Sequence, residues 1–134
     1  MTDPTVQIVV GVDDDFRIRE SIESLVESAG FTSFVFSSAE EFLRSGKLFE
    51  ASCLITDVRM VGMDGLELQH RLRLGRPELP VIFISGHHDD EVERKALQGG
   101  AFAFMYKPFD PVDLLEAVNQ AMSNCQPFEQ PRCK

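Results

Sequence analysis

Four segments of this chain end in side chains that could carry out phosphate chemistry. Three consecutive carboxylates at positions 13–15 follow one apolar run, and Asp57 follows another. Ser85 and Lys107 close two further apolar runs in the same way. Carboxylate oxygens bind Mg²⁺ and can attack phosphorus, while a lysine charge and a serine hydroxyl can stabilise phosphoryl oxygens. These residue types therefore favour magnesium-assisted phosphoryl transfer to a carboxylate.

Such side chains meet only if the runs before them are parallel strands of one sheet. Apolar runs alternate with amphipathic stretches along the chain, which predicts five strand–helix units. The predicted strands cover residues 6–12, 31–36, 52–56, 81–84 and 101–106. The predicted helices cover about 18–29, 38–44, 66–74, 91–98 and 110–122. The fold class is therefore α/β, a doubly wound five-stranded parallel sheet with five helices in a three-layer sandwich.

Two helix starts have capping signals. Ser38-Ala-Glu-Glu41 has the form of a capping box, and Asp110 with Pro111 supplies an N-cap followed by an N1 proline. The predicted buried stripe of the last helix consists of Val112, Leu115, Val118 and Met122.

Composition limits the classes of function. The 134 residues set the expectation at one domain, covering 1–124, and residues 125–134 are predicted to be a tail or the start of a linker. The net charge of -9 argues against nucleic-acid binding by this segment alone. The sequence has neither an apolar run long enough for a membrane span nor a leader-like start, so we expect no membrane association and a cytoplasmic location.

Each candidate residue also has an ordinary structural explanation. A strand-end aspartate can cap a helix, Ser85 can be a turn residue, and Lys107 can be a solvated charge. The segment His87-His88-Asp89-Asp90 lacks a third spaced ligand and is predicted to be a solvated loop rather than a metal site. The functional interpretation rests on the arrival of all the candidates at one sheet edge, where ligands bind in such folds.

The residues resemble the receiver domain of bacterial two-component response regulators over about 6–122. The similar motifs are Val12-Asp-Asp-Asp15, Thr56-Asp-Val-Arg-Met60 with Met63-Asp-Gly65, Phe83-Ile-Ser-Gly86 and Tyr106-Lys-Pro-Phe109. Ser38-Ala-Glu-Glu-Phe-Leu43 and Ser85-Gly-His87 are most similar to the FixJ-like branch, which carries a LuxR-type helix-turn-helix. The resemblance implies a flavodoxin-like fold with strand order 2-1-3-4-5.

The resemblance also implies a metal site around a phosphoacceptor. Asp57 maps onto the phosphorylated aspartate. Mg²⁺ is expected to bind Asp14, Asp57 and the backbone carbonyl of Arg59, with Asp13 contributing through water. Asp15 is expected to be an outer charge.

The switch residues follow from the same resemblance. Lys107 and Ser85 match the two positions that contact the phosphoryl group, and Phe104 matches an aromatic residue that rotates on phosphorylation. The bond between Lys107 and Pro108 is expected to be cis.

The implied function is a switch that accepts phosphate from a histidine kinase and catalyses only its own phosphorylation and dephosphorylation. Phosphorylation is expected to change the surface of the fourth helix, fifth strand and fifth helix (91–122) and to allow homodimerisation there. Control of transcription would act through a DNA-binding domain outside this chain.

One alternative function is a haloacid-dehalogenase-type phosphatase, because Asp13-Asp-Asp15 has the DxD form. Another is a phosphorylation-independent pseudo-receiver, because Val61 stands where the family usually has proline.

Overall fold

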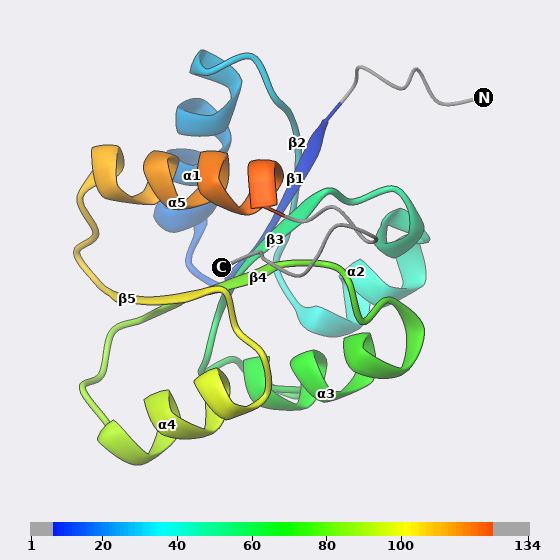
Figure 1. The fold of residues 1–134 in the computed structure, drawn as a ribbon, viewed down its shortest axis with the longest axis vertical. Coiled ribbons are helices and arrows are strands. Elements are labelled where there is room, and N and C mark those ends of the chain that lie inside the picture. The colour runs from blue at the N-terminus through cyan, green and yellow to red at the C-terminus, as the bar shows by residue number, and fades with distance from the viewer. Residues whose placement is uncertain (1–6, 125–134) are drawn as a thin grey trace.

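The computed structural model describes residues 7–124 as a parallel sheet covered by helices on both faces (Figure 1). The strands are β1 (Ile8–Val12), β2 (Thr32–Phe36), β3 (Cys53–Asp57), β4 (Val81–Ser85) and β5 (Ala103–Tyr106). Their order in the sheet is β2-β1-β3-β4-β5, and every neighbouring pair is parallel. The predicted fold class and strand order are confirmed.

The helices form the two outer layers of the sandwich. They are α1 (Phe16–Ser28), α2 (Ala39–Ser45), α3 (Gly65–Gly75), α4 (Asp90–Gln98) and α5 (Pro111–Asn124). Helices α1 and α5 lie on one face of the sheet, and α2, α3 and α4 lie on the other (Figure 1). A short 3₁₀ helix, η1 (Lys47–Phe49), precedes β3 and was not predicted.

The sheet separates two apolar clusters. One cluster packs β-strand residues such as Val10 and Phe83 against α2, α3 and α4, with Phe42 and Leu68 fully buried. The other packs the alternate strand residues against α1 and α5. Strands β1, β3 and β4 are buried at every position, which explains their nearly continuous apolar sequences.

Two predicted details are corrected by the structure. Strand β5 begins at Ala103 rather than at position 101, because the N–H of Ala101 bonds the carbonyl of Ala96 and still belongs to the end of α4. The predicted stripe of α5 is wrong at Val112, whose surface is 71% exposed. Apolar residues stand next to each other in the sequence of α5, so two different stripes along the helix could be buried. The stripe that is buried consists of Leu114, Ala117, Val118 and Ala121, and its two alanines let the helix approach the sheet closely.

Several expectations concern residues outside the described part of the chain. These are the start of the first strand at Val6, the first six residues of the predicted domain, and the tail or linker at 125–134. Within residues 7–124, no helix combines the length and the apolar character needed to cross a bilayer.

Candidate functional site

The register of the sheet brings the candidate residues to one edge. Val12 pairs with Thr56, Asp57 pairs with Ile84, and Ser85 pairs with Tyr106. The residue after each strand, or the last residue of the strand, therefore lies at the same level at the carboxyl edge. The predicted convergence of the acidic corner with Asp57, Ser85 and Lys107 is found in the structure.

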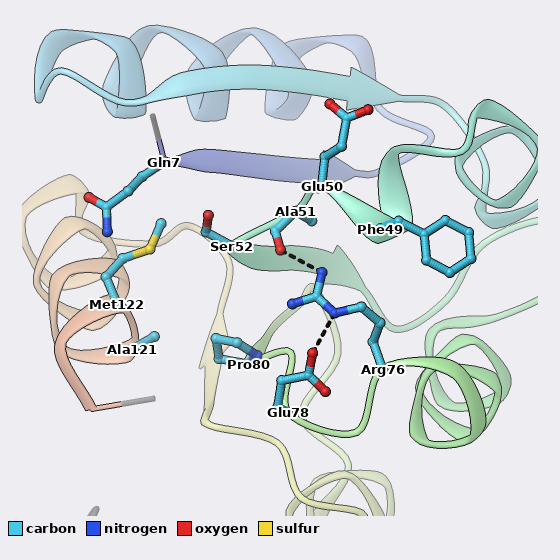
Figure 2. Close-up of a pocket in the computed structure, with 10 residues that line it drawn as sticks. All are labelled: Gln7, Phe49, Glu50, Ala51, Ser52, Arg76, Glu78, Pro80, Ala121 and Met122. Carbon is cyan, nitrogen blue, oxygen red and sulfur yellow. Dashed lines mark hydrogen bonds and ion pairs between the residues drawn. The ribbon is translucent and has the colours of Figure 1, made fainter. Parts of the chain in front are cut away.

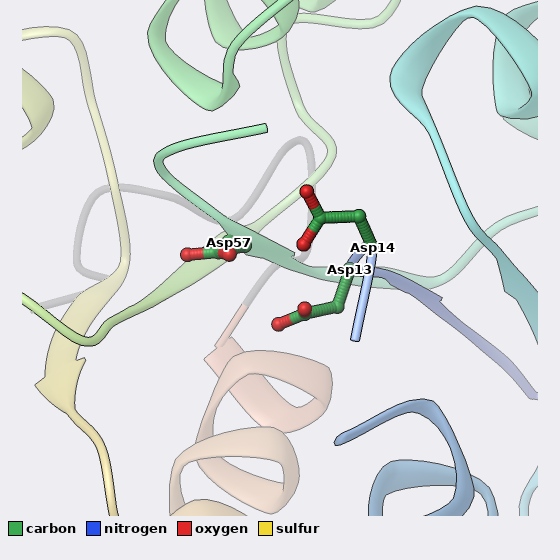
Figure 3. A group of neighbouring side chains, drawn as sticks. All are labelled: Asp13, Asp14 and Asp57. Carbon is green, nitrogen blue, oxygen red and sulfur yellow. The ribbon is translucent and has the colours of Figure 1, made fainter. Parts of the chain in front are cut away.

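Three carboxylates form a compact group at this edge (Figure 3). Oxygen atoms of Asp13, Asp14 and Asp57 all lie within 4.8 Å of one another. Asp13 and Asp57 are buried, whereas Asp14 is exposed to solvent. Asp15 stands apart from the group, because its side chain accepts a hydrogen bond from the N–H of Arg17 and caps α1.

The Lys107 ammonium lies between the two buried carboxylates. Its Nζ is 3.3 Å from Asp57 Oδ2 and 3.0 Å from Asp13 Oδ2. It donates a hydrogen bond to Asp57 and forms an ion pair with Asp13, and this ion pair is the interaction that the structure gives to the buried Asp13 Oδ2. Burial by itself would lower the pKa of Lys107, but the pairing with Asp13 and Asp57 outweighs burial and raises this pKa.

The buried carboxylates are held at an electrostatic cost. Burial raises the pKa of Asp57 above its ordinary value, although Lys107 acts in the opposite direction. Burial also raises the pKa of Asp13, and the nearby charge of Asp57 raises it further. A single lysine therefore offsets only part of the cost of two buried negative charges.

This donor set suits a hard divalent cation. The three side chains offer only carboxylate oxygens, which Mg²⁺ prefers, and Asp14 leaves the site open to water. Asp13 Oδ2 is buried without a hydrogen-bond donor among the described residues, so an additional positive charge would satisfy it. The segment His87-His88-Asp89-Asp90 does not form such a group of ligands in residues 7–124.

The loop after β3, residues 58–64, is tied to three other elements. The N–H of Gly65 bonds the carbonyl of Val58 at 2.8 Å, which joins the loop to α3. The Arg59 guanidinium pairs with Asp89 of the β4–α4 loop at 3.3 Å. The Glu40 carboxylate of α2 accepts a hydrogen bond from the N–H of Met63 at 2.9 Å. Sequence reasoning assigned Glu40 only to a helix start and missed this contact.

Ser85 is buried at the end of β4, and its hydroxyl is engaged with its own loop. The hydroxyl donates a hydrogen bond to the carbonyl of His87 at 3.0 Å and accepts one from the N–H of His87 at 3.1 Å. The structure therefore holds Ser85 at the site edge with its hydroxyl bonded to the β4–α4 backbone.

Two aromatic residues of β5 lie beside that loop. The half-buried Phe104 ring packs 5.9 Å from the Phe83 ring and 5.4 Å from the Tyr106 ring. Tyr106 stacks on His88 at 3.7 Å and donates a hydrogen bond to Glu93 of α4. The hydrogen bond to Glu93 is the main cause that raises the pKa of Tyr106 to about 12. Sequence reasoning identified Phe104 but not Tyr106.

The bond between Lys107 and Pro108 is cis, as expected.

A separate hollow lies at the opposite, amino-terminal end of the strands (Figure 2). Arg76 occupies it and donates hydrogen bonds to the carbonyls of Leu48 and Ala51 and to the Glu78 carboxylate. Arg76 is thus engaged in binding these groups, and within residues 7–124 the hollow does not contain a cluster of carboxylates like the one at the carboxyl edge.

The fold and the acidic edge together define the receiver class of signalling domains. Residues 9–119 match the response regulator receiver domain family, and the chain belongs to that family. Receiver domains are phosphorylation-activated switches of two-component systems, whose general partner is a histidine kinase. The expected family is confirmed.

Individual relatives agree with this assignment. The response regulator protein TmoT of Ectopseudomonas mendocina is 43% identical over 115 residues, covering 86% of this chain and 52% of TmoT. The DNA-binding transcriptional regulator NtrC of Escherichia coli K12 is 38% identical over 125 residues, covering 93% of this chain and 27% of NtrC. The crystal structure of FixJ-N has 33% identity and a TM-score of 0.78, covering 92% of this chain and 96% of FixJ-N. The chain thus spans about half or less of these two curated relatives.

Proposed function

We propose that Asp57 accepts a phosphoryl group from the phosphohistidine of a histidine kinase. The observation that carries the proposal is the position of Lys107 Nζ, which is 3.3 Å from Asp57 and 3.0 Å from Asp13 at the carboxyl edge of the sheet. A fixed positive charge beside a carboxylate can stabilise the charge of a phosphoryl group transferred to that carboxylate.

The transfer conserves atoms and charge in a single displacement. An Asp57 oxygen forms a bond to phosphorus while the bond from phosphorus to the imidazole nitrogen breaks, and the electron pair stays on that nitrogen. Lys107 stabilises the negative charge on the phosphoryl oxygens. Hydrolysis by water later returns Asp57 to its free carboxylate. The domain catalyses only this phosphorylation and dephosphorylation of itself.

Mg²⁺ is the proposed cofactor. Asp14, Asp57 and the backbone carbonyl of Arg59 would hold it directly, and Asp13 would contribute through water. When bound, the ion supplies positive charge that offsets the repulsion of the carboxylates and of the incoming phosphoryl oxygens. The carboxylate group within 4.8 Å supports this assignment, as does the buried Asp13 Oδ2, which among the described residues has only the ion pair with Lys107.

The proposed switch begins at Ser85. Its hydroxyl would exchange the bond with the His87 carbonyl for a bond to the phosphoryl group on Asp57. This movement shifts the β4–α4 loop and opens space for the Phe104 ring, which changes the population of conformers of the surface formed by α4, β5 and α5. That surface is the proposed site of homodimerisation after phosphorylation.

The output of the complete protein is proposed from its relatives. NtrC is named as a DNA-binding transcriptional regulator, and this chain covers only 27% of it. We therefore infer that the cytoplasmic full-length protein controls transcription through a DNA-binding domain outside this chain, with residues 125–134 starting the linker. The net charge of -9 supports the expectation that the receiver segment by itself does not bind DNA.

Phosphorylation is tested by incubating the protein with acetyl phosphate and Mg²⁺ and measuring intact mass. We expect one base-labile phosphoryl group on wild-type protein and none on Asp57→Asn. Glu50→Gln, which changes an exposed carboxylate near η1, is the matched control and should be modified like wild type. Equal modification of Asp57→Asn would refute the assignment, and an unmodified wild-type protein would favour the pseudo-receiver alternative.

Magnesium binding is tested on the same protein by titration calorimetry. Asp14→Ala should abolish binding, because it removes the solvent-facing carboxylate of the group. Unchanged affinity in this variant would move the site to Asp13 or Asp15.

A further inference from the structure

The loop of residues 58–64 determines what surrounds Asp57, because it begins at the residue after the acceptor and includes Arg59. Its two ends are joined by the bond from Gly65 N–H to the Val58 carbonyl at 2.8 Å. The side chain at its tip does not anchor it, since 86% of the surface of Val61 is exposed. The side chains of Met60 and Met63 pack on the apolar cluster under α2, α3 and α4, whereas Val61 and Gly62 contribute no buried side chain. The tip at positions 61 and 62 therefore depends on contacts made by its backbone.

Glu40 of α2 makes such a contact. Its Oε2 accepts a hydrogen bond at 2.9 Å from the N–H of Met63, which lies 23 residues further along the chain. The neighbouring Gly62 has a φ of 83°, and a Cβ atom built there would lie only 2.6 Å from the same Oε2. The carboxylate thus occupies the space that a side chain at position 62 would need, so backbone and carboxylate fit closely together.

The position of Glu40 is itself well fixed. It lies in the first turn of α2, between the fully buried side chains of Ala39 and Phe42. Ser38 caps this turn by accepting a hydrogen bond from the N–H of Glu41 at 3.1 Å. The bond from Met63 N–H is the main cause that lowers the pKa of Glu40, so the group stays ionised, and charged acceptors make stronger hydrogen bonds than neutral ones.

We propose that Glu40 is a positioning residue for phosphoryl transfer: its carboxylate clamps the backbone at Gly62 and Met63 and thereby holds the 58–64 loop in place beside Asp57. This inference rests on the proposed phosphorylation of Asp57. Glu40 touches none of the reacting atoms. It acts by keeping the Arg59 end of the loop in the geometry that the acceptor requires, because small displacements of positioned groups slow transfer steps strongly.

Three variants separate the clamp from a general effect of charge or helix stability. Glu40→Ala removes the acceptor. Glu40→Gln removes the charge but keeps an acceptor oxygen for Met63. Glu41→Ala is the matched control, since Glu41 lies in the same turn and accepts from the N–H of Ser37 at 2.9 Å rather than from the loop.

The experiment measures the rate of phosphorylation by acetyl phosphate as a function of Mg²⁺ concentration, together with thermal unfolding. We expect Glu40→Ala to lose roughly tenfold in rate, the size of effect for one lost charged hydrogen bond. Its apparent affinity for Mg²⁺ should fall as well. Glu40→Gln should recover most of both losses, and Glu41→Ala should match wild type in both.

The outcomes against the proposal are distinct. A folded Glu40→Ala protein with the wild-type rate and Mg²⁺ affinity would overturn it, as would equal losses in Glu40→Ala and Glu41→Ala. If Glu40→Ala does not fold, Glu40→Asp decides, because it keeps the charge but is one methylene too short. A wild-type rate in Glu40→Asp would overturn the clamp. Failure of wild-type protein to be phosphorylated would instead refute the proposed function.

Discussion

At the residue scale, the acidic edge is organised around Asp13, the most buried of its carboxylates. Asp13 Oδ1 accepts a hydrogen bond from the N–H of Asp15 at 2.9 Å, whereas Oδ2 has only the charge of Lys107. Without a bound cation, the carboxylates of Asp13 and Asp57 therefore repel each other, and Lys107 offsets only part of this repulsion. Binding of the proposed Mg²⁺ would relieve that repulsion and so gain binding free energy.

The first prediction concerns Asp13→Asn in a chelating buffer. The raised pKa of Asp13 means that its carboxyl group stabilises the folded state fully below its unfolded value of about 3.8 and loses that contribution as pH rises through the folded pKa. Asparagine avoids this loss. We expect Asp13→Asn to have the larger free energy of unfolding at pH 7, by about 1.4 kcal/mol for each unit of raised pKa.

The pH dependence and a control check this explanation. Urea unfolding should show the advantage of Asp13→Asn shrinking as pH falls toward 3.8. Asp64→Asn changes an exposed cap of α3 and should alter stability by less than about 0.5 kcal/mol. A less stable Asp13→Asn protein at pH 7 would contradict the argument.

At the element scale, the junction between β3 and α3 is tightly packed beside Asp57, the proposed acceptor. A Cβ atom at Gly65 would lie 2.4 Å from the backbone oxygen of Asp57 and 3.0 Å from the Phe83 ring. The contact is with backbone, which cannot rotate away as a side chain can. The first residue of α3 must therefore be glycine for the helix to begin directly beside the end of β3.

The second prediction follows from this junction. Gly65→Ala should destabilise the fold by about 1–3 kcal/mol, the usual cost of overpacking, and should slow phosphorylation of Asp57. Gly75→Ala is the control within the same helix, because its Cβ would meet Leu48 at an ordinary 3.7 Å. Urea unfolding measures both. Equal stability of the two variants would show that the close approach is tolerated.

The elements also show which parts of the site the sequence could predict. Polar residues that end or directly follow apolar runs are recognisable in the sequence, so Asp57 and Lys107 could be predicted. Glu40 and Tyr106 were missed because their partners, Met63 and Glu93, lie 23 and 13 residues away and meet them only in the folded chain. Helix periodicity likewise could not choose between the two apolar stripes of α5, which is why Val112 was misplaced.

At the scale of the whole molecule, the proposed output surface spans both outer layers. Phe104 packs on the cluster under α3 and α4, whereas Ala103 and Met105 pack on the cluster under α1 and α5. Strand β5 is also an edge strand, and its residues are only partly buried. It is therefore the element through which a change at α4 can reach α5.

The third prediction concerns this surface. Beryllofluoride with Mg²⁺, which imitates the phosphoryl group, should shift amide resonances over residues 91–122 and increase the dimer fraction in sedimentation. Ser85→Ala should bind beryllofluoride but lose most of these shifts. This variant lacks the hydroxyl that is proposed to exchange its hydrogen bond with the His87 carbonyl for one to the phosphoryl group. Shifts confined to α1, with 91–122 unchanged, would refute this output surface.

The two-faced packing of β5 has a thermodynamic consequence for signalling. If phosphate on Asp57 changes the affinity of the α4–β5–α5 surface for a partner, then that partner must change the phosphorylation equilibrium of Asp57 by the same factor. The influence runs through the alternating side chains of one strand in either direction. Binding of a partner to the α4–β5–α5 surface would thus change the stability of the phosphorylated state of Asp57. The phosphorylated fraction would therefore depend on the partner concentration as well as on the kinase.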